Sequence, residues 1–114
     1  MPSERALTAL DDIVANVALA VSFTRDVTLE AFAADKMCFY AVVRCLEIVS
    51  EASRRLDAEI LDRHPELPWR AIHGAGNVYR HDYGDVTPQI VLATVREALP
   101  PLLAAVEAEL ARAG

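Results

Sequence analysis

The chain has 114 residues, of which 54% are hydrophobic, 25% are charged and 6% are aromatic, and its formal net charge is -6. This length suits one domain spanning residues 1–114, and the composition favours an all-α bundle. No run reaches about 18 consecutive apolar residues and no signal peptide is evident, so we expect a cytoplasmic protein without a membrane span. The acidic balance argues against a general nucleic-acid binder, because affinity for phosphate backbones comes from clustered Lys and Arg.

The first half of the chain predicts two long helices separated by a short turn. Ser3 is a good N-cap for a helix over residues 4–23. Thr28 caps a short turn through residue 33, and Asp35 caps a second long helix that continues to about residue 56. The apolar stripes expected to face the core are Leu7, Leu10, Ile13 or Val14, Val17 and Val21 in the first helix, and Met37, Ala41, Ile48 and Ala52 in the second.

Four other side chains of the second long helix need a separate explanation. Arg44 and Glu51 lie near its apolar stripe, where an unpaired charge would be expensive. They fit either a solvated edge or an intrachain pair, or else the mouth of a cleft or a dimer seam. Cys38 and Cys45 are seven residues apart on one helix face, which excludes a local metal knuckle and indicates two reduced thiols in the core.

The second half predicts a short helix, a motif helix and a last long helix. The short helix over residues 57–63 must end before Pro65. The motif helix runs from about Trp69 to Tyr83, with Pro68 suited to its start and the Trp69 ring expected to pack as an anchor. Thr87 caps a last helix over residues 88–111, which the prolines at 100 and 101 should kink.

The candidate chemistry lies on the motif helix. His73, Asn77 and His81 are spaced four residues apart and form one stripe, with Arg80 at its margin. Residues 68–81 contain two Arg, two His and no acid, so if RNA is bound, it meets this basic window and, in a symmetric dimer, its copy. Additional contacts to RNA are expected from Arg70 and from His73.

Two glycines within this helix predict a close approach. Gly74 and Gly76 each cost about 1 kcal/mol relative to Ala in a helix, so their presence needs a reason. The close approach of another backbone or of a phosphate is the physical reason that fits.

These residues resemble a known family. The runs Pro68-Trp69-Arg70, Gly74-Ala75-Gly76-Asn77 and His81-Asp82-Tyr83 are similar to the signature of the HEPN-type ribonuclease toxins of the HepT group, in which Arg, a polar residue, three positions, His, any residue and Tyr follow in order. Residues 46–52, LEIVSEA, also resemble the second-helix motif of that group. The resemblance extends over residues 6–110 and implies a HEPN-like up-down bundle of four main helices that forms a symmetric homodimer.

One position departs from the family pattern. Gly76 stands where the signature has its Arg, whereas Asn77, His81 and Tyr83 match. Arg80 follows Gly76 by four residues and lies within about 40° of the same helix face. Helical side chains lean toward the N-terminus, so we expect the Arg80 guanidinium to fold back over Gly76 and replace the missing cation.

The resemblance also implies an activity and partners. It implies a metal-independent endoribonuclease without a cofactor, in which two copies of His81 face each other across a dimer cleft, Asn77 orients the His or binds phosphate, and Arg80 is the cation. It implies a toxin of a type VII-like toxin-antitoxin pair, whose antitoxin is a minimal, MntA-like nucleotidyltransferase. Tyr83 occupies the position to which such an antitoxin attaches AMP in some pairs, although a simple packing role at the helix end also fits.

Two other interpretations remain open from the sequence. The loss of Arg at position 76 is also consistent with a catalytically disabled HEPN module that binds a nucleotidyltransferase. A plain helical oligomerisation domain would explain the core but not the cluster of Asn77, Arg80, His81 and Tyr83. The carboxylates Asp82 and Asp85 are more typical of solvated turn residues than of metal ligands, because no third carboxylate accompanies them.

Overall fold

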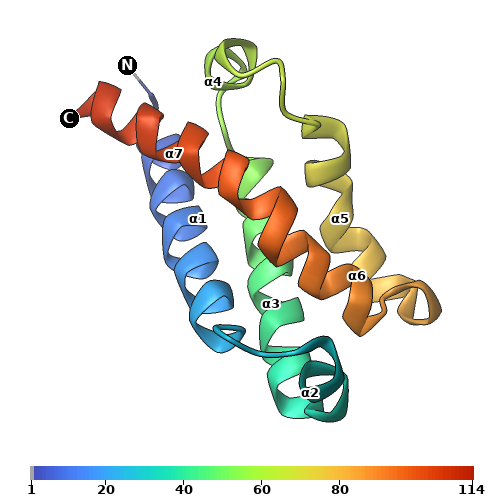
Figure 1. Ribbon diagram of the computed structural model, residues 1–114. Coiled ribbons are helices and arrows are strands. Elements are labelled where there is room, and N and C mark those ends of the chain that lie inside the picture. Colours follow the sequence, from blue (N-terminus) through green and yellow to red (C-terminus); the bar gives the residue numbers. More distant parts are fainter. Residues whose placement is uncertain (1) are drawn as a thin grey trace.

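The computed structural model describes residues 2–114, apart from the side chain of Tyr83. Its elements in chain order are α1 (Glu4–Phe23), α2 (Leu29–Ala34), α3 (Lys36–Ser53), α4 (Ala58–Arg63), α5 (Trp69–His81), η1 (Tyr83–Asp85), α6 (Pro88–Ala93), η2 (Thr94–Ala98) and α7 (Leu99–Ala113). The long helices run alternately up and down, and both termini lie at the same end (Figure 1). The predicted all-α up-down bundle is confirmed.

The predicted helix starts are confirmed by their capping hydrogen bonds. The hydroxyl of Ser3 accepts from Ala6 N–H at 3.0 Å, which satisfies one of the free amides of the first turn of α1. Thr28, Asp35 and Thr87 do the same for α2, α3 and α6. Asp57 precedes α4 without capping it, and its carboxylate accepts instead from the Ser3 N–H and hydroxyl.

The core lies where α1, α3 and the last helices meet, and its stripes differ in part from the prediction. Residues Leu10, Ile13 and Val17 of α1 are buried as expected, but Val21 is exposed and the stripe continues through Ala20. In α3 Ala52 is buried as expected, but Met37 is exposed and Ala41 and Ile48 are half-buried. The other buried apolar residues of α3 are Val42, Val43, Cys45, Leu46 and Val49. The predicted reduced thiols are free, with Cys45 buried and Cys38 half-buried.

Several predicted boundaries are wrong by two or three residues. The second long helix α3 ends at Ser53, and α5 ends at His81 and is followed by the short 3-10 turn η1. The last helix contains the π-helical segment η2, which ends just before Leu99 and Pro100. Prolines lack the N–H that an α-helical turn needs, so the wider turn that precedes them accommodates the missing donors.

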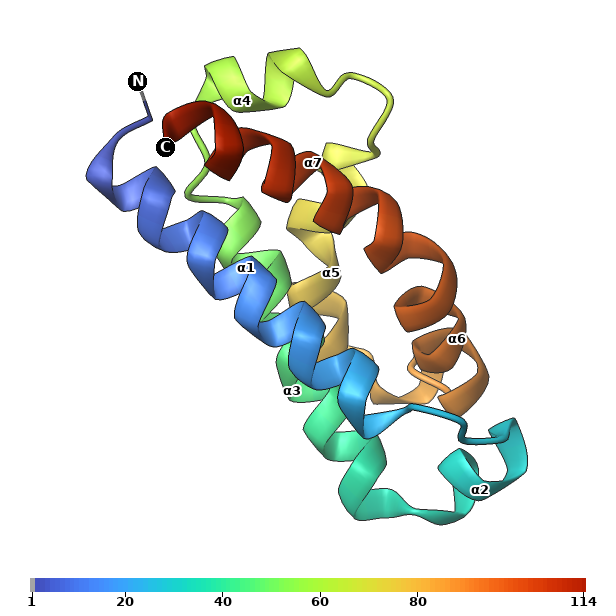
Figure 2. The ribbon, with the colours of Figure 1, turned by 60° about the vertical axis from the view of Figure 1, so that its left-hand side comes forward.

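The motif helix α5 packs against the rest of the bundle mainly through α3 (Figures 1 and 2). Between α5 and the segment η2–α7 lies a largely apolar cavity of about 270 Å³, lined among others by Leu46, Ile72, Tyr79 and Leu102. As a result, one long side of the motif helix rests on the scaffold and the others do not.

Two segments have the length and composition of a membrane span, which the sequence-based prediction did not anticipate. These are Glu4–Phe23, with a mean hydropathy of 1.6, and Pro88–Ala113, with 1.3. Core helices of soluble proteins pass the same test, and here the apolar sides of both segments pack into the bundle core.

Candidate active site

The structure brings three of the predicted residues together in one polar pocket. His73, Asn77 and Arg80 of α5 line a cavity of about 420 Å³ that opens between α5, the C-terminal half of α3 and the start of α1. The remaining lining residues are Arg5, Ser50, Glu51, Arg54, Arg55 and Gly76. The pocket therefore combines the predicted motif stripe with groups from two other helices.

At Gly76 α5 lies close to α3, as the cost of a helical glycine had predicted. The Ser50 hydroxyl donates to the Ile72 carbonyl at 2.7 Å and accepts from the Gly76 N–H at 2.9 Å. A Cβ at position 76 would lie 3.1 Å from the Ser50 oxygen, whereas a Cβ at position 74 would have no described neighbouring atom within 4 Å. Gly76 thus permits contact with α3, and no packing contact requires Gly74 to be a glycine.

The Arg80 guanidinium folds back over Gly76. Its Nη1 atom lies 3.5 Å from the position that a Cβ at residue 76 would take. The side chain of Arg80 therefore places a positive charge next to the position that the first side-chain atom of residue 76 would take. Its role as the substitute cation remains a prediction.

The other predicted site residues lie outside this pocket. His81 is the last residue of α5 and is exposed, one turn beyond Asn77. Arg70 is exposed at the first turn and does not line the pocket. The prediction for Tyr83 falls on a side chain outside those that the structure describes.

The basic residues contributed by α1 and α3 were missed from the sequence. Arg5 lies in the first turn of α1, Arg54 follows the last residue of α3, and Arg55 pairs with Asp12 at 2.9 Å. Arg5 and Arg54 reach the same pocket as Arg80 only through the tertiary packing of the helices. The sequence did contain one signal. Arg54 and Arg55 follow Glu51 by three and four residues, so all three lie at the C-terminal end of α3.

The structure places the two charged residues of α3 in different surroundings. Arg44 is exposed and lies 3.7 Å from Glu47, which matches the solvated edge with an intrachain pair. Glu51 is exposed and lines the pocket, which matches the mouth of a cleft.

His73 lines the pocket and packs against Trp69. Their ring centroids are 6.0 Å apart, and the Trp69 indole N–H donates to the His64 carbonyl at 2.9 Å. The predicted anchoring role of Trp69 is consistent with this position, where it is half-buried against the core. His73 Nε2 is buried and has no hydrogen-bond partner among the described residues.

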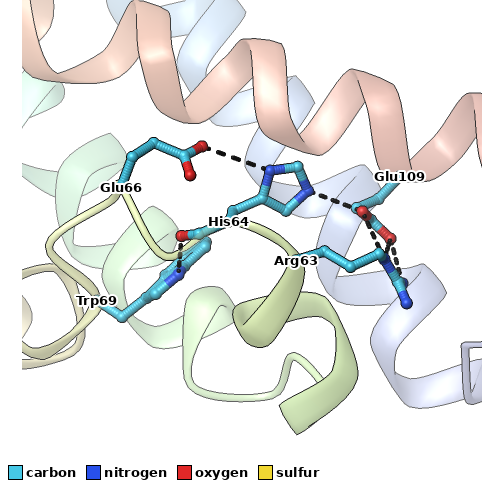
Figure 3. Close-up of polar contacts among 5 residues, drawn as sticks. All are labelled: Arg63, His64, Glu66, Trp69 and Glu109. Atoms are coloured by element: carbon cyan, nitrogen blue, oxygen red, sulfur yellow. Dashed lines mark hydrogen bonds and ion pairs between the residues drawn. The ribbon is translucent and has the colours of Figure 1, made fainter.

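A buried carboxylate fixes the loop that leads into α5 (Figure 3). Glu109 of α7 is 3% exposed; it accepts from the Arg63 guanidinium and from His64 Nε2, the latter at 2.7 Å. The hydrogen bond from Arg63 is the main cause that lowers the pKa of Glu109 to about 2. Because Trp69 binds the His64 carbonyl, this network also sets where the motif helix begins.

Within the described part of the chain, His, Cys, Asp and Glu side chains form no group of three or more that could hold a metal ion. The donors that the pocket offers are guanidinium and amide groups, which suit an anionic oxygen.

The chain matches known proteins over most of its length. The family model described as "Ribonuclease HepT-like" matches residues 13–109. A protein of Thermococcus cleftensis named "Probable ribonuclease HepT" is 37% identical over 93 residues, which cover 82% of this chain and 84% of that protein. "Putative RNase MJ1380" of Methanocaldococcus jannaschii is 33% identical over 98 residues, covering 86% of this chain and 90% of that protein. No solved structure matches the chain significantly.

Proposed function

Because the chain belongs to the Ribonuclease HepT-like family, we propose that it is a metal-independent endoribonuclease of the cytoplasm that acts as a homodimer. The relatives named above as ribonucleases support the reaction class. The observation in this chain that carries the proposal is the position of Arg80, whose guanidinium covers Gly76 beside Asn77 on the helix that also bears His81.

The proposed reaction is cleavage of RNA by its own 2'-hydroxyl. One His81 imidazole takes the proton of the attacking 2'-hydroxyl, and the His81 of the second copy gives a proton to the leaving 5'-oxygen. The Arg80 guanidinium stabilises the negative charge that develops on the phosphorus oxygens, and the Asn77 amide orients the phosphate. Such chemistry needs proton transfer near neutral pH and a fixed cation, and these residues supply both.

The proposal is tested by RNA cleavage with the purified chain and its variants. We expect His81→Ala to lower the cleavage rate by about 10²- to 10⁴-fold, because it removes the acid and the base. Arg80→Ala should lower it by about 10²-fold, since it removes the transition-state cation. Arg25→Ala, an exposed substitution in the turn after α1, is the control and should leave the rate unchanged.

Two outcomes of this assay would count against the assignment. Cleavage by His81→Ala at the wild-type rate would reject the proposed proton transfers. Full activity of Arg80→Ala beside an inactive His81→Ala would reject Arg80 as the substitute cation. The homodimer itself is checked by light scattering, which should give twice the 12.5 kDa mass of the chain.

A second candidate function follows from the glycine at position 76. If the missing Arg disables catalysis, the module acts by binding a nucleotidyltransferase. This candidate predicts no cleavage by the purified wild type together with a stable complex with that enzyme. Cleavage that disappears in His81→Ala would exclude it.

The proposed biological setting is a toxin-antitoxin pair with a minimal nucleotidyltransferase. The antitoxin would neutralise the toxin by attaching AMP to Tyr83, where it blocks the end of the motif helix that carries His81. Incubation of both proteins with ATP, followed by mass spectrometry, should show one added AMP on the wild type and none on Tyr83→Phe. An unmodified wild type would argue against this form of control.

A further inference from the structure

A cluster of guanidinium groups lies beside the motif helix and is mostly unused by the proposed chemistry. Arg5, Arg54 and Arg80 come from three different helical regions and line the same cavity. Among the described residues, none of the three forms an ion pair. We call this cavity the arginine pocket.

The charge of the arginine pocket is unusual for this chain. The chain carries a net charge of -6, yet four of its 11 basic residues line one cavity. Arg55 is neutralised by Asp12, and Glu51 is the one carboxylate among the described lining residues, so three free guanidinium groups less one carboxylate leave two positive charges in excess. Like charges that surround one space repel each other, and a bound anion removes that cost.

We propose that the arginine pocket binds a phosphate group of the RNA strand, next to the phosphodiester that His81 acts on. Guanidinium groups bind phosphate oxygens through paired hydrogen bonds, and the Asn77 amide adds a neutral donor. The identification of the polymer as RNA rests on the proposed function. The binding of a phosphate group rests on the charge and geometry of the pocket alone.

The positions of these residues along α5 define the path of the bound strand. His73 marks one end of the pocket, and His81 lies eight residues further on the same stripe, about 12 Å along the axis at about 1.5 Å per residue. Arg80 precedes His81 directly in the chain, and its guanidinium lies over Gly76 in the pocket. An RNA strand that follows the stripe therefore presents one phosphate to Arg5 and Arg54 and a neighbouring phosphate to His81.

The first test uses inorganic phosphate and does not depend on cleavage. His73 lines the pocket, so the proton NMR resonance of its ring, assigned by its loss in His73→Gln, reports occupancy. Phosphate should shift this resonance in the wild type and in the control Arg25→Ala/Arg112→Ala. In Arg5→Ala/Arg54→Ala the shift should be lost. A shift that persists in that variant, or that is absent from the wild type, would overturn the proposal.

The second test measures RNA binding in a His81→Ala background, where the strand is not cut. Arg5→Ala/Arg54→Ala should weaken binding by about tenfold or more and reduce the slope of log affinity against log salt by about 0.7, the value for one phosphate contact on a single strand. The control Arg25→Ala/Arg112→Ala removes the same charge from exposed positions outside the pocket. Equal effects of the two double variants would show a general charge effect and overturn the proposal.

These tests separate the pocket from the catalytic assignment. RNA binding that depends on Arg5 and Arg54, without cleavage by the wild type, supports the pocket and rejects the ribonuclease. Binding of phosphate without binding of RNA rejects the strand assignment made here.

Discussion

The contact between Ser50 and Gly76 is the residue-scale feature on which the site depends. The Ser50 side chain is 2% exposed and is held by its hydrogen bonds to Ile72 and Gly76. It has little room to move away from a larger residue at position 76. A Cβ at position 76 therefore requires the Ser50 side chain to shift by a few tenths of an ångström.

A pair of matched glycine substitutions measures this contact. Gly74→Ala should stabilise the chain by about 0.5–1 kcal/mol, because Ala is the better helix former and the space is open. Gly76→Ala should forfeit that gain, because its Cβ would lie 3.1 Å from the Ser50 oxygen. Urea unfolding of the two variants gives the comparison.

The same pair in a Ser50→Gly background identifies the cause. Without the Ser50 side chain, Gly76→Ala should become as favourable as Gly74→Ala. If the two substitutions stabilise the wild type equally, the contact is looser than the structure indicates.

Sequence reasoning at this scale succeeded for residues on one helix and failed for residues on different helices. The angular position of Arg80 relative to Gly76 follows from helical geometry, and the structure places the guanidinium there. The addition of Arg5 and Arg54 required the packing of α1 and α3 against α5, which no local pattern encodes.

Among the elements, the loop before α5 depends on one ion cluster. The lowered pKa of Glu109, about 2 against an ordinary 4.5, means that the folded state favours the ionised carboxylate. The resulting stability is fully present above about pH 4.5 and is lost as the pH falls toward 2.

Glu109→Gln should lower the free energy of unfolding by about 2 kcal/mol at pH 7, because Arg63 and His64 lose their charged partner. The difference from the wild type should shrink as the pH falls from 4.5 toward 2, where the wild-type carboxylate also becomes protonated. Urea unfolding at several pH values checks both statements. Glu107→Gln, an exposed change on the same helix, should have no such effect, and a constant difference at all pH values would contradict the explanation.

Helix starts were predictable and several helix ends were not. Ser3, Thr28, Asp35 and Thr87 mark starts because their side chains bond to amides within the next turn. The end of α5 at His81 and the wide turn of η2 depend on how each segment packs and on donors missing further along the chain. The tertiary ion cluster of Glu109 left no signal because its members lie 45 and 46 residues apart.

In the whole molecule, α5 is the long helix with the fewest buried residues, since Gly76 is the one buried residue among those described in it. It packs mainly on α3, and the apolar cavity separates it from η2 and α7. Regions with few buried contacts open at lower free energy than the rest of a domain. Amide hydrogen exchange should therefore be faster in α5 than in α1 and α3. Equal protection of all three helices would contradict this order.

The two walls of the arginine pocket come from helices that differ in how well they are packed. Arg5 and Arg54 belong to the well-packed pair α1 and α3, whereas Asn77 and Arg80 belong to the loosely held α5. An anion that touches both walls stabilises the packing of α5 on α3, because it binds the folded pocket and not a state in which α5 has opened. Substrate would then stiffen the very helix that carries His81, so that the nuclease becomes most ordered at the moment it is loaded.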